Sequence, residues 1–247
     1  FSLFDMSSLR TGIMAGALCP IELMRQVNEK MFMDITSVYG MTETSPGMTQ
    51  TRVDDTFEVR CTTVGREYEF TEVKVLDPET GLECPVGVQG EICCRGYNVM
   101  KGYYKNPEAT AQVIDKNGFM HSGDLGVKDE NGNYRITGRI KDMIIRGGEN
   151  ISPKEVEDYL YKIPEVRDVQ VVAVASPKYG EDVGAFIILK DGCELTREDV
   201  RDFCKNHIAR YKIPRYVFLI KQFPMTGSGK IQKFRLREMA VEMCQQQ

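Results

Sequence analysis

The chain has 247 residues, of which 42% are hydrophobic, so it can bury one large core or two smaller ones. Its net charge is −4, which argues against a nucleic-acid-binding protein, because such proteins usually carry a basic surface over a whole domain. The eight cysteines form no Cys-x-x-Cys pair and there are only two histidines, which argues against a zinc site or a disulfide scaffold.

The same composition predicts a protein of the reducing cytoplasm. No apolar run approaches the ~20 residues of a membrane-spanning helix, and the first residues do not resemble a signal peptide. Because residue 1 is phenylalanine, we expect that the natural start lies upstream of it.

The first part of the chain is predicted to be α/β. Apolar residues at helical spacing over 21–32 lead into a strand at 34–39 and then a polar loop. From 63 to 95 the pattern changes to short strands: 72–76 alternates, 77–81 forms a turn and 89–94 resumes. This second pattern predicts an antiparallel sheet or a small barrel.

Beyond Gly138 we predict the order helix, strand, strand, helix, strand, helix. Ser152 is followed by proline and, three residues on, by Glu155, which indicates a capping box, and Thr196 begins the next helix in a similar way. Residues 169–175 and 183–189 are rich in β-branched side chains and predict strands of a compact α+β unit.

Three segments of the chain combine polar and small residues in patterns that could bind a ligand. Residues 39–46, Tyr-Gly-Met-Thr-Glu-Thr-Ser-Pro, follow a strand and could stack a base, bond a phosphate and hold a metal, or could simply form a capped polar turn. Residues 121–126 place Asp124 between glycines, which suits either a ribose diol or a plain β-turn. Residues 138–150 combine dense charge with the paired glycines Gly147 and Gly148, which is unusual for a plain linker, although the two glycines could also form a simple hairpin turn.

Residues 221–235 place Lys230 on a turn of small residues after a strand-like run. A ligand could approach this backbone closely while the ammonium reaches a phosphate or carboxylate. The alternative is a surface hairpin with a solvated lysine. A phosphate-binding loop of the Walker type is disfavoured, because Pro224, not glycine, stands five residues before Gly229, and Met225 stands four before it.

Taken together and in this order, these segments strongly resemble the adenylate-forming superfamily of acyl-CoA synthetases, luciferases and peptide-synthetase adenylation domains. The runs Tyr-Gly-Met-Thr-Glu-Thr, Ser-Gly-Asp, Gly-Arg-Ile-Lys-Asp and Pro-Met-Thr-Gly-Ser-Gly-Lys-Ile carry the resemblance, which covers essentially the whole chain and is greatest to bacterial fatty-acyl-CoA synthetases. It implies that residues 1–140 end a large α/β domain (1–60) with a β-barrel-like part (61–140), and that 141–247 form a small mobile α+β lid.

The resemblance also implies a role for individual residues. Tyr39 would lie against adenine, Thr42 would bond the α-phosphate, Glu43 would hold Mg²⁺, Asp124 would take the ribose hydroxyls and Lys230 would bridge carboxylate and phosphate. The remaining nucleotide-binding residues would be Gly16, Ala17, Gly40, Met41 and Arg139. Lys141 would be the hinge, and Gly147 and Gly148 would line the path of CoA.

The implied activity is an ATP-dependent fatty acid CoA ligase that forms an acyl-adenylate and then a thioester, with fatty acid, ATP and CoA as substrates and Mg²⁺ as metal. The family's phosphate loop and most of its acyl pocket lie upstream and are absent from these residues. We therefore expect a C-terminal part that completes adenylation poorly on its own. A non-catalytic nucleotide or acyl-CoA binding module and a peptide-synthetase adenylation domain stay open as alternatives.

Overall fold

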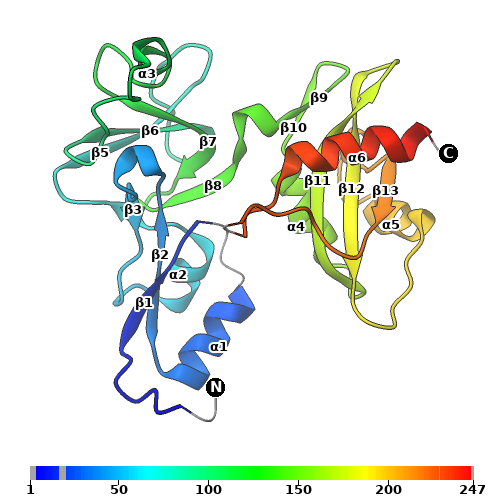
Figure 1. Cartoon of the computed structure of the whole chain (residues 1–247), viewed down its shortest axis with the longest axis horizontal. Helices are drawn as coiled ribbons and strands as arrows, with labels where there is room; N and C mark the ends of the chain where they lie inside the picture. Colours follow the sequence, from blue (N-terminus) through cyan, green and yellow to red (C-terminus); the bar gives the residue numbers. More distant parts are fainter. Residues whose placement is uncertain (1–3, 17–20, 228, 246–247) are drawn as a thin grey trace. The chain divides into compact units, whose positions relative to one another are not determined.

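A computed structural model describes residues 4–16, 21–227 and 229–245 of the chain (Figure 1). The chain divides into two compact units, Phe1–Thr137 and Gly138–Gln247. Among the described residues no helix is long and apolar enough to cross a membrane.

The first unit begins with a four-stranded sheet in the order β1-β2-β3-β4. β1 (Thr11–Met14) runs parallel to β2 (Asp34–Tyr39), and the short strands β3 (Thr49–Gln50) and β4 (Arg66–Glu67) add antiparallel. Two helices, α1 (Ile21–Met31) and α2 (Phe57–Thr62), pack on β2 through Met24, Ile35 and Cys61. The predicted succession of helix, strand and loop is confirmed here.

The rest of the first unit is an antiparallel sheet in the order β5-β6-β7-β8, whose last strand continues two residues past the end of the unit at Thr137. Its strands are β5 (Thr71–Leu76), β6 (Gly90–Gly96), β7 (Met120–Lys128) and β8 (Tyr134–Arg139), and helix α3 (Pro107–Val113) stands between β6 and β7 in sequence. The strand order is linear, so among the described residues this part is an open sheet and not a closed barrel. Met48, Ile92 and Tyr134 are fully buried in its core.

The second unit is built on a five-stranded sheet in the order β10-β9-β12-β11, with β13 paired to β12. After the short 3-10 turn η2 (Ile140–Asp142), its elements are β9 (Ile144–Arg146), β10 (Glu149–Ile151), α4 (Pro153–Leu160), β11 (Val166–Ser176), β12 (Gly180–Leu189), α5 (Arg197–Cys204), the 3-10 turn η3 (Arg210–Lys212), β13 (Tyr216–Leu219) and α6 (Lys233–Gln245). The prediction of an α+β unit is confirmed.

Alternation along β11 and β12 explains why helices cover both faces of this sheet. Val169 and Val171 join the core beneath α4 and α5, whereas Val172 and Val174 join the core beneath α6. Successive strand residues point to opposite faces, so two apolar faces require two helical layers. Figure 1 shows α6 crossing one face of β11–β13, with α4 and α5 on the other.

One local prediction needs correction, and two short strands were missed. Helix α4 begins after Ser152 with Pro153 at its first position, as expected, but Ser152 forms no capping hydrogen bond from its side chain. At the second predicted helix start the full capping box does form, between Thr196 and Asp199. The strands of the β9–β10 hairpin were not predicted, because strands of three residues are too short to show a period, although a hairpin turn at Gly147 and Gly148 was one of the two interpretations of these glycines.

Candidate active site

The loop after β2 is closed on itself by backbone contacts. It contains a 3-10 turn, η1 (Thr42–Thr44), that ends at Ser45 in a left-handed conformation with a φ of 58°. A Cβ built on Gly40 would lie 1.9 Å from the carbonyl oxygen of Pro46, so only glycine fits there. The closed loop buries Thr44 and leaves Thr42 exposed and Glu43 half-buried.

Tyr39 and Asp124, two residues predicted to bind the same nucleoside, are in direct contact. The Tyr39 hydroxyl donates to Asp124 Oδ2 at 2.8 Å across 85 residues of sequence. Asp124 is only 6% exposed, and the Tyr39 ring packs against the core of the β5–β8 sheet. The structure therefore brings the loop after β2 and the Asp124 segment of β7 together at one place.

Glu43 is held by a residue that the sequence did not point to. The hydroxyl of Tyr103 donates to Glu43 Oε1 at 2.9 Å, and the backbone N–H of Met100 donates to the Glu43 carbonyl oxygen at 2.8 Å. The Glu43 carboxylate is thus oriented without being buried. A partly exposed carboxylate of this kind fits a hard divalent cation such as Mg²⁺.

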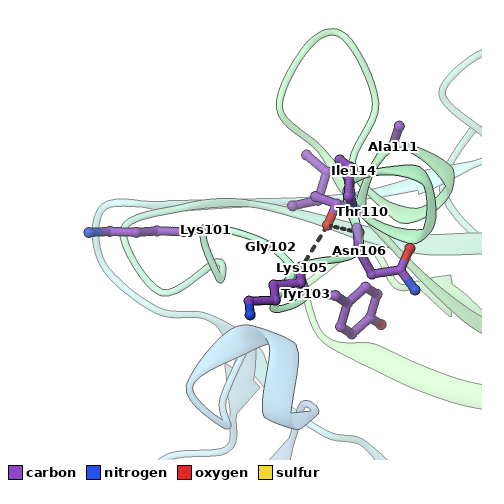
Figure 2. A pocket seen from close by; sticks show the side chains of 9 residues that line it. Lys101, Gly102, Tyr103, Lys105, Asn106, Thr110, Ala111 and Ile114 are labelled. Atoms are coloured by element: carbon purple, nitrogen blue, oxygen red, sulfur yellow. Dashed lines mark hydrogen bonds between the residues drawn. The ribbon is translucent and has the colours of Figure 1, made fainter.

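A pocket of 510 Å³ lies next to this contact and is lined by the segment from Lys101 to Ile114 (Figure 2). Thr110 Oγ1 accepts from the Tyr103 N–H and donates to the Asn106 carbonyl oxygen, each at 2.9 Å. These bonds fix the approach to α3 and hence the backbone of Tyr103. Of the predicted site residues that the structure describes, none lines the pocket, but Tyr103 connects its wall to Glu43.

Two further predicted nucleotide-binding residues, Gly16 and Ala17, follow β1 in the sequence. Gly16 is exposed with a φ of +83°, and a Cβ there would meet nothing within 4 Å of the described structure. Ala17 lies outside the described residues.

Met41, another predicted nucleotide-binding residue, belongs to the loop after β2 and precedes η1. Its backbone forms hydrogen bonds with the Thr44 hydroxyl, so Met41 shapes the loop through its main chain.

In the second unit, Lys230 is exposed on a tight turn between Met225 and Ile231, which form an isolated bridge. The turn is closed by Thr226, whose N–H donates to the Lys230 carbonyl oxygen at 2.8 Å and whose hydroxyl accepts from the Lys230 N–H at 3.1 Å. Buried Phe223 before the turn and Leu236 after it anchor both ends in the core beneath α6. The structure presents a solvated ammonium on an anchored turn.

The predicted hinge and CoA-path residues also belong to this second unit. Arg139 ends β8, and Lys141 is exposed in η2, next to Asp142, which accepts from Arg237 Nη2 at 2.8 Å. Gly147 and Gly148 form the turn of the β9–β10 hairpin with φ of +61° and +93°, the conformation expected of a glycine turn. A Cβ on Gly147 would approach Tyr179 to 3.3 Å, whereas one on Gly148 would meet nothing within 4 Å of the described structure.

A polar cluster on β6 and β7 was missed by the sequence analysis. Glu91, Cys93 and His121 place their donor atoms within 4.8 Å of one another, a grouping that could hold a metal ion. The sequence pattern at 89–94 predicted a strand and no polar cluster. The available clue was Glu91, an acidic residue next to the apolar run Ile92-Cys93-Cys94, because a buried carboxylate needs donors nearby.

These observations define the class of protein. Residues 2–104 match the family model of AMP-binding enzymes and residues 155–230 match that of the AMP-binding enzyme C-terminal domain. The chain belongs to the adenylate-forming superfamily, as its motifs predicted.

Among relatives, the chain is 54% identical over 244 residues to YngI of Bacillus subtilis (strain 168), whose name describes an acyl-CoA synthetase; the match covers 98% of this chain and 44% of the relative. It is 43% identical over 239 residues to the human mitochondrial medium-chain acyl-CoA ligase ACSF2, covering 96% and 39%. The structure of ATP-bound MatB from Rhodopseudomonas palustris matches with a TM-score of 0.86 at 34% identity, covering 92% and 44%. The chain thus spans less than half the length of each.

Proposed function

We propose that this chain carries the nucleotide-binding and lid portions of an ATP-dependent fatty acid CoA ligase that works in the cytoplasm. The observation that supports this most directly is the hydrogen bond between Tyr39 and Asp124, since it assembles the predicted adenine and ribose contacts in one unit. The similarity to acyl-CoA synthetases and ligases supports the reaction class.

The first half-reaction is attack of a carboxylate oxygen on the α-phosphorus of ATP, which forms the acyl-adenylate and expels pyrophosphate. Both reactants are anionic, so the protein has to neutralise charge and align the attack. Thr42 would donate to the α-phosphate, Asp124 would accept from the ribose hydroxyls, and Lys230 would lie between the two anions. Mg²⁺, held by Glu43, would supply further charge neutralisation on the phosphates.

In the second half-reaction the sulfur of CoA attacks the acyl carbonyl carbon, the bond to AMP breaks and the thiol proton passes to solvent. The lid would turn about Lys141 between the two steps, which suits an exposed residue without fixed packing. Gly147 and Gly148 would then leave room for the pantetheine arm. Arg139 would add a contact to the ribose, and Gly16 and Ala17 would pass beside the adenine edge.

The proposal is tested by offering the complete gene product fatty acids of graded length with ATP, Mg²⁺ and CoA, and measuring pyrophosphate release and thioester formation separately. A ligase produces both, and omission of CoA leaves only the adenylate. A non-catalytic binding module would bind nucleotide and release no pyrophosphate.

The identity of the acyl acceptor is a separate question that one comparison raises. An amide bond synthetase, McbA of Marinactinospora thermotolerans, matches with a TM-score of 0.85 at 32% identity, covering 96% of this chain and 49% of that one. Supplying amines in place of CoA distinguishes the two acceptors, and supplying a carrier protein tests the peptide-synthetase alternative. We propose CoA because the relatives with higher identity are named for that acceptor.

A further inference from the structure

Asp124 lies in a segment of β7 where the pairing with β6 is irregular. In the pairing of β6 with β7, Glu91 stands opposite Leu125 and Cys93 opposite His121. Three residues of β7, Ser122 to Asp124, therefore stand opposite Ile92 alone, and Gly123 takes a φ of +71°. Bulges of this kind bend a strand and re-aim a side chain, and here the side chain is that of Asp124.

The side chain of Glu91 holds this bulge from the neighbouring strand. Its Oε1 accepts from the Gly123 N–H at 2.8 Å, and its Oε2 contacts His121 Nδ1 at 2.7 Å. Glu91 is 8% exposed, so its carboxylate depends on these donors in place of water. Ser122 completes the clamp: its hydroxyl donates to the Ile92 carbonyl oxygen at 2.6 Å and accepts from the Asp124 N–H at 3.1 Å.

The alternative use of Glu91, Cys93 and His121 is a metal site, and the geometry favours the hydrogen-bonded cluster. The 2.7 Å distance between nitrogen and oxygen is that of a direct charge-assisted bond. Burial, followed by the charge of Glu91, raises the pKa of the Cys93 thiol, which opposes the thiolate that a metal would require. The Cys93 sulfur instead lies within hydrogen-bonding distance of two groups of this cluster, His121 Nδ1 at 3.4 Å and the Glu91 carbonyl oxygen at 3.8 Å.

We infer that Glu91 is a positioning residue for the nucleoside site: by clamping Gly123 and His121 it fixes the bulge that presents Asp124 to the ribose. Glu91 itself would not touch the nucleotide. This inference rests on the proposed function for the ligand of Asp124, but the clamp on Gly123 stands independently of it.

The test compares Glu91→Ala with Glu91→Gln in the complete gene product. In the Glu91→Gln variant the amide oxygen can accept from Gly123, and the amide N–H can donate to Nδ1 of the other histidine tautomer, so the clamp is retained. The measurement is the ratio of kcat/KM for ATP to that for 2′-deoxy-ATP and for 3′-deoxy-ATP in adenylate formation. We expect Glu91→Ala to lower this ratio about 10-fold, towards the ratio of Asp124→Ala, because a hydrogen bond to a charged group contributes about that factor. We expect Glu91→Gln to keep the ratio near its wild-type value.

A matched control is Glu72→Ala, which removes a carboxylate of the same sheet that pairs with Lys74 and Arg95 and, among the described residues, forms no ion pair with the bulge. We expect it to leave the ratio unchanged. A purely structural role for Glu91 would lower kcat/KM for all three nucleotides equally and leave the ratio at its wild-type value, which would overturn the inference.

Hydrogen exchange at the Gly123 amide supplies a readout that does not depend on nucleotide. We expect exchange there to accelerate at least about 10-fold in Glu91→Ala and to stay near the wild-type rate in Glu91→Gln. Accelerated exchange in a protein that forms no adenylate would reject the proposed function and keep the clamp; unchanged exchange would reject the clamp. A Co²⁺ titration tests the metal alternative. A thiolate-to-cobalt absorption band that is lost in Cys93→Ser would assign the cluster to a metal and overturn the inference about Glu91.

Discussion

Tyr103 holds Glu43 through a hydrogen bond of 2.9 Å from its hydroxyl to Oε1, which links the loop before α3 to the loop after β2. The bond also raises the pKa of the Tyr103 phenol. Because the folded-state pKa is raised, the contribution of this bond is present below the ordinary tyrosine pKa near 10 and is lost as pH rises through the higher folded value. The contact is therefore intact throughout the neutral range.

We predict that Tyr103→Phe weakens the use of Mg²⁺ and leaves the fold intact. Without its donor, the Glu43 carboxylate loses orientation, and residues that orient a metal ligand typically contribute about 10-fold or more to metal affinity. The Mg²⁺ concentration for half-maximal adenylate formation should rise about 10-fold, and Mn²⁺ binding followed by electron paramagnetic resonance should weaken in parallel. The neighbouring Tyr104, which is 87% exposed, provides the control Tyr104→Phe. Equal Mg²⁺ dependence in the two variants would contradict the role.

We predict that Lys230→Ala nearly abolishes adenylate formation and spares the reaction of preformed acyl-adenylate with CoA. One charge pair at ~4 Å and an effective dielectric of ~20 contributes up to ~4 kcal/mol, or about a thousandfold in rate. Single-turnover measurements of each half-reaction test this. Lys221→Ala removes an exposed lysine of the same basic segment and should change neither rate appreciably. Equal losses in both half-reactions for Lys230→Ala would count against its assignment to adenylation.

We predict that Lys141→Pro slows thioester formation at least about 10-fold and adenylation less than about 3-fold. Proline fixes its own φ and restricts Ile140 before it, so the chain can no longer alternate between two backbone states at this point. Lys141→Ala keeps the backbone free and should behave like the wild type in both steps. Identical slowing of both half-reactions in the proline variant would remove the basis for a hinge here.

We predict that Gly40→Ala destabilises the first unit and abolishes nucleotide binding. The added Cβ would lie 1.9 Å from the Pro46 carbonyl oxygen, and closely packed backbone cannot yield without opening the loop. The expected loss in free energy of unfolding is about 2–4 kcal/mol, measured by chemical denaturation. Gly192→Ala is the comparison, since its Cβ meets open space in the described structure and only its φ of +76° costs about 1 kcal/mol. Similar losses of unfolding free energy in the two variants would show that the loop shifts to relieve the clash, which would contradict the prediction.

We predict that the stability of the second unit depends on a buried carboxylate that pairs with two arginines. Asp182 is fully buried and accepts from Arg146 Nε at 2.5 Å and from Arg215 Nη1 at 2.9 Å. Burial alone would raise the pKa of Asp182, but the bonds from Arg146, Ser176 and Arg215 outweigh it and lower the pKa below its ordinary value. With a depressed folded-state pKa, the stabilisation is present above the unfolded value near 3.9 and is lost as pH falls through the folded one.

Asp182→Asn should therefore lower the free energy of unfolding by about 3 kcal/mol at neutral pH, with the gap to the wild type narrowing below about pH 4. Urea denaturation at a series of pH values measures this. Asp158→Asn removes an exposed partner of Lys154 and should cost less than about 1 kcal/mol. A gap that stays constant with pH would show that the charge of Asp182 is not the source of the stability.

Local patterns in the sequence determined the class of fold, the order of most elements and the family. The β-branched runs at 169–175 and 183–189 became β11 and β12, and the Thr196 capping box forms, because these signals act over a few neighbouring residues. The motif residues of the site were also visible, because each motif is contiguous. Their roles in binding and catalysis stay predictions.

Tertiary structure alone decided which of these residues meet. The hydroxyl of Tyr39 reaches Asp124 across 85 residues and Tyr103 reaches Glu43 across 60, and no local pattern encodes either contact. The bulge at Ser122 to Asp124 and its clamp by Glu91 arise only when β6 and β7 pair, because a register shift is a property of two strands together. The sequence by itself determined which chemical groups the site contains, and the pairing of distant strands decided how they are held.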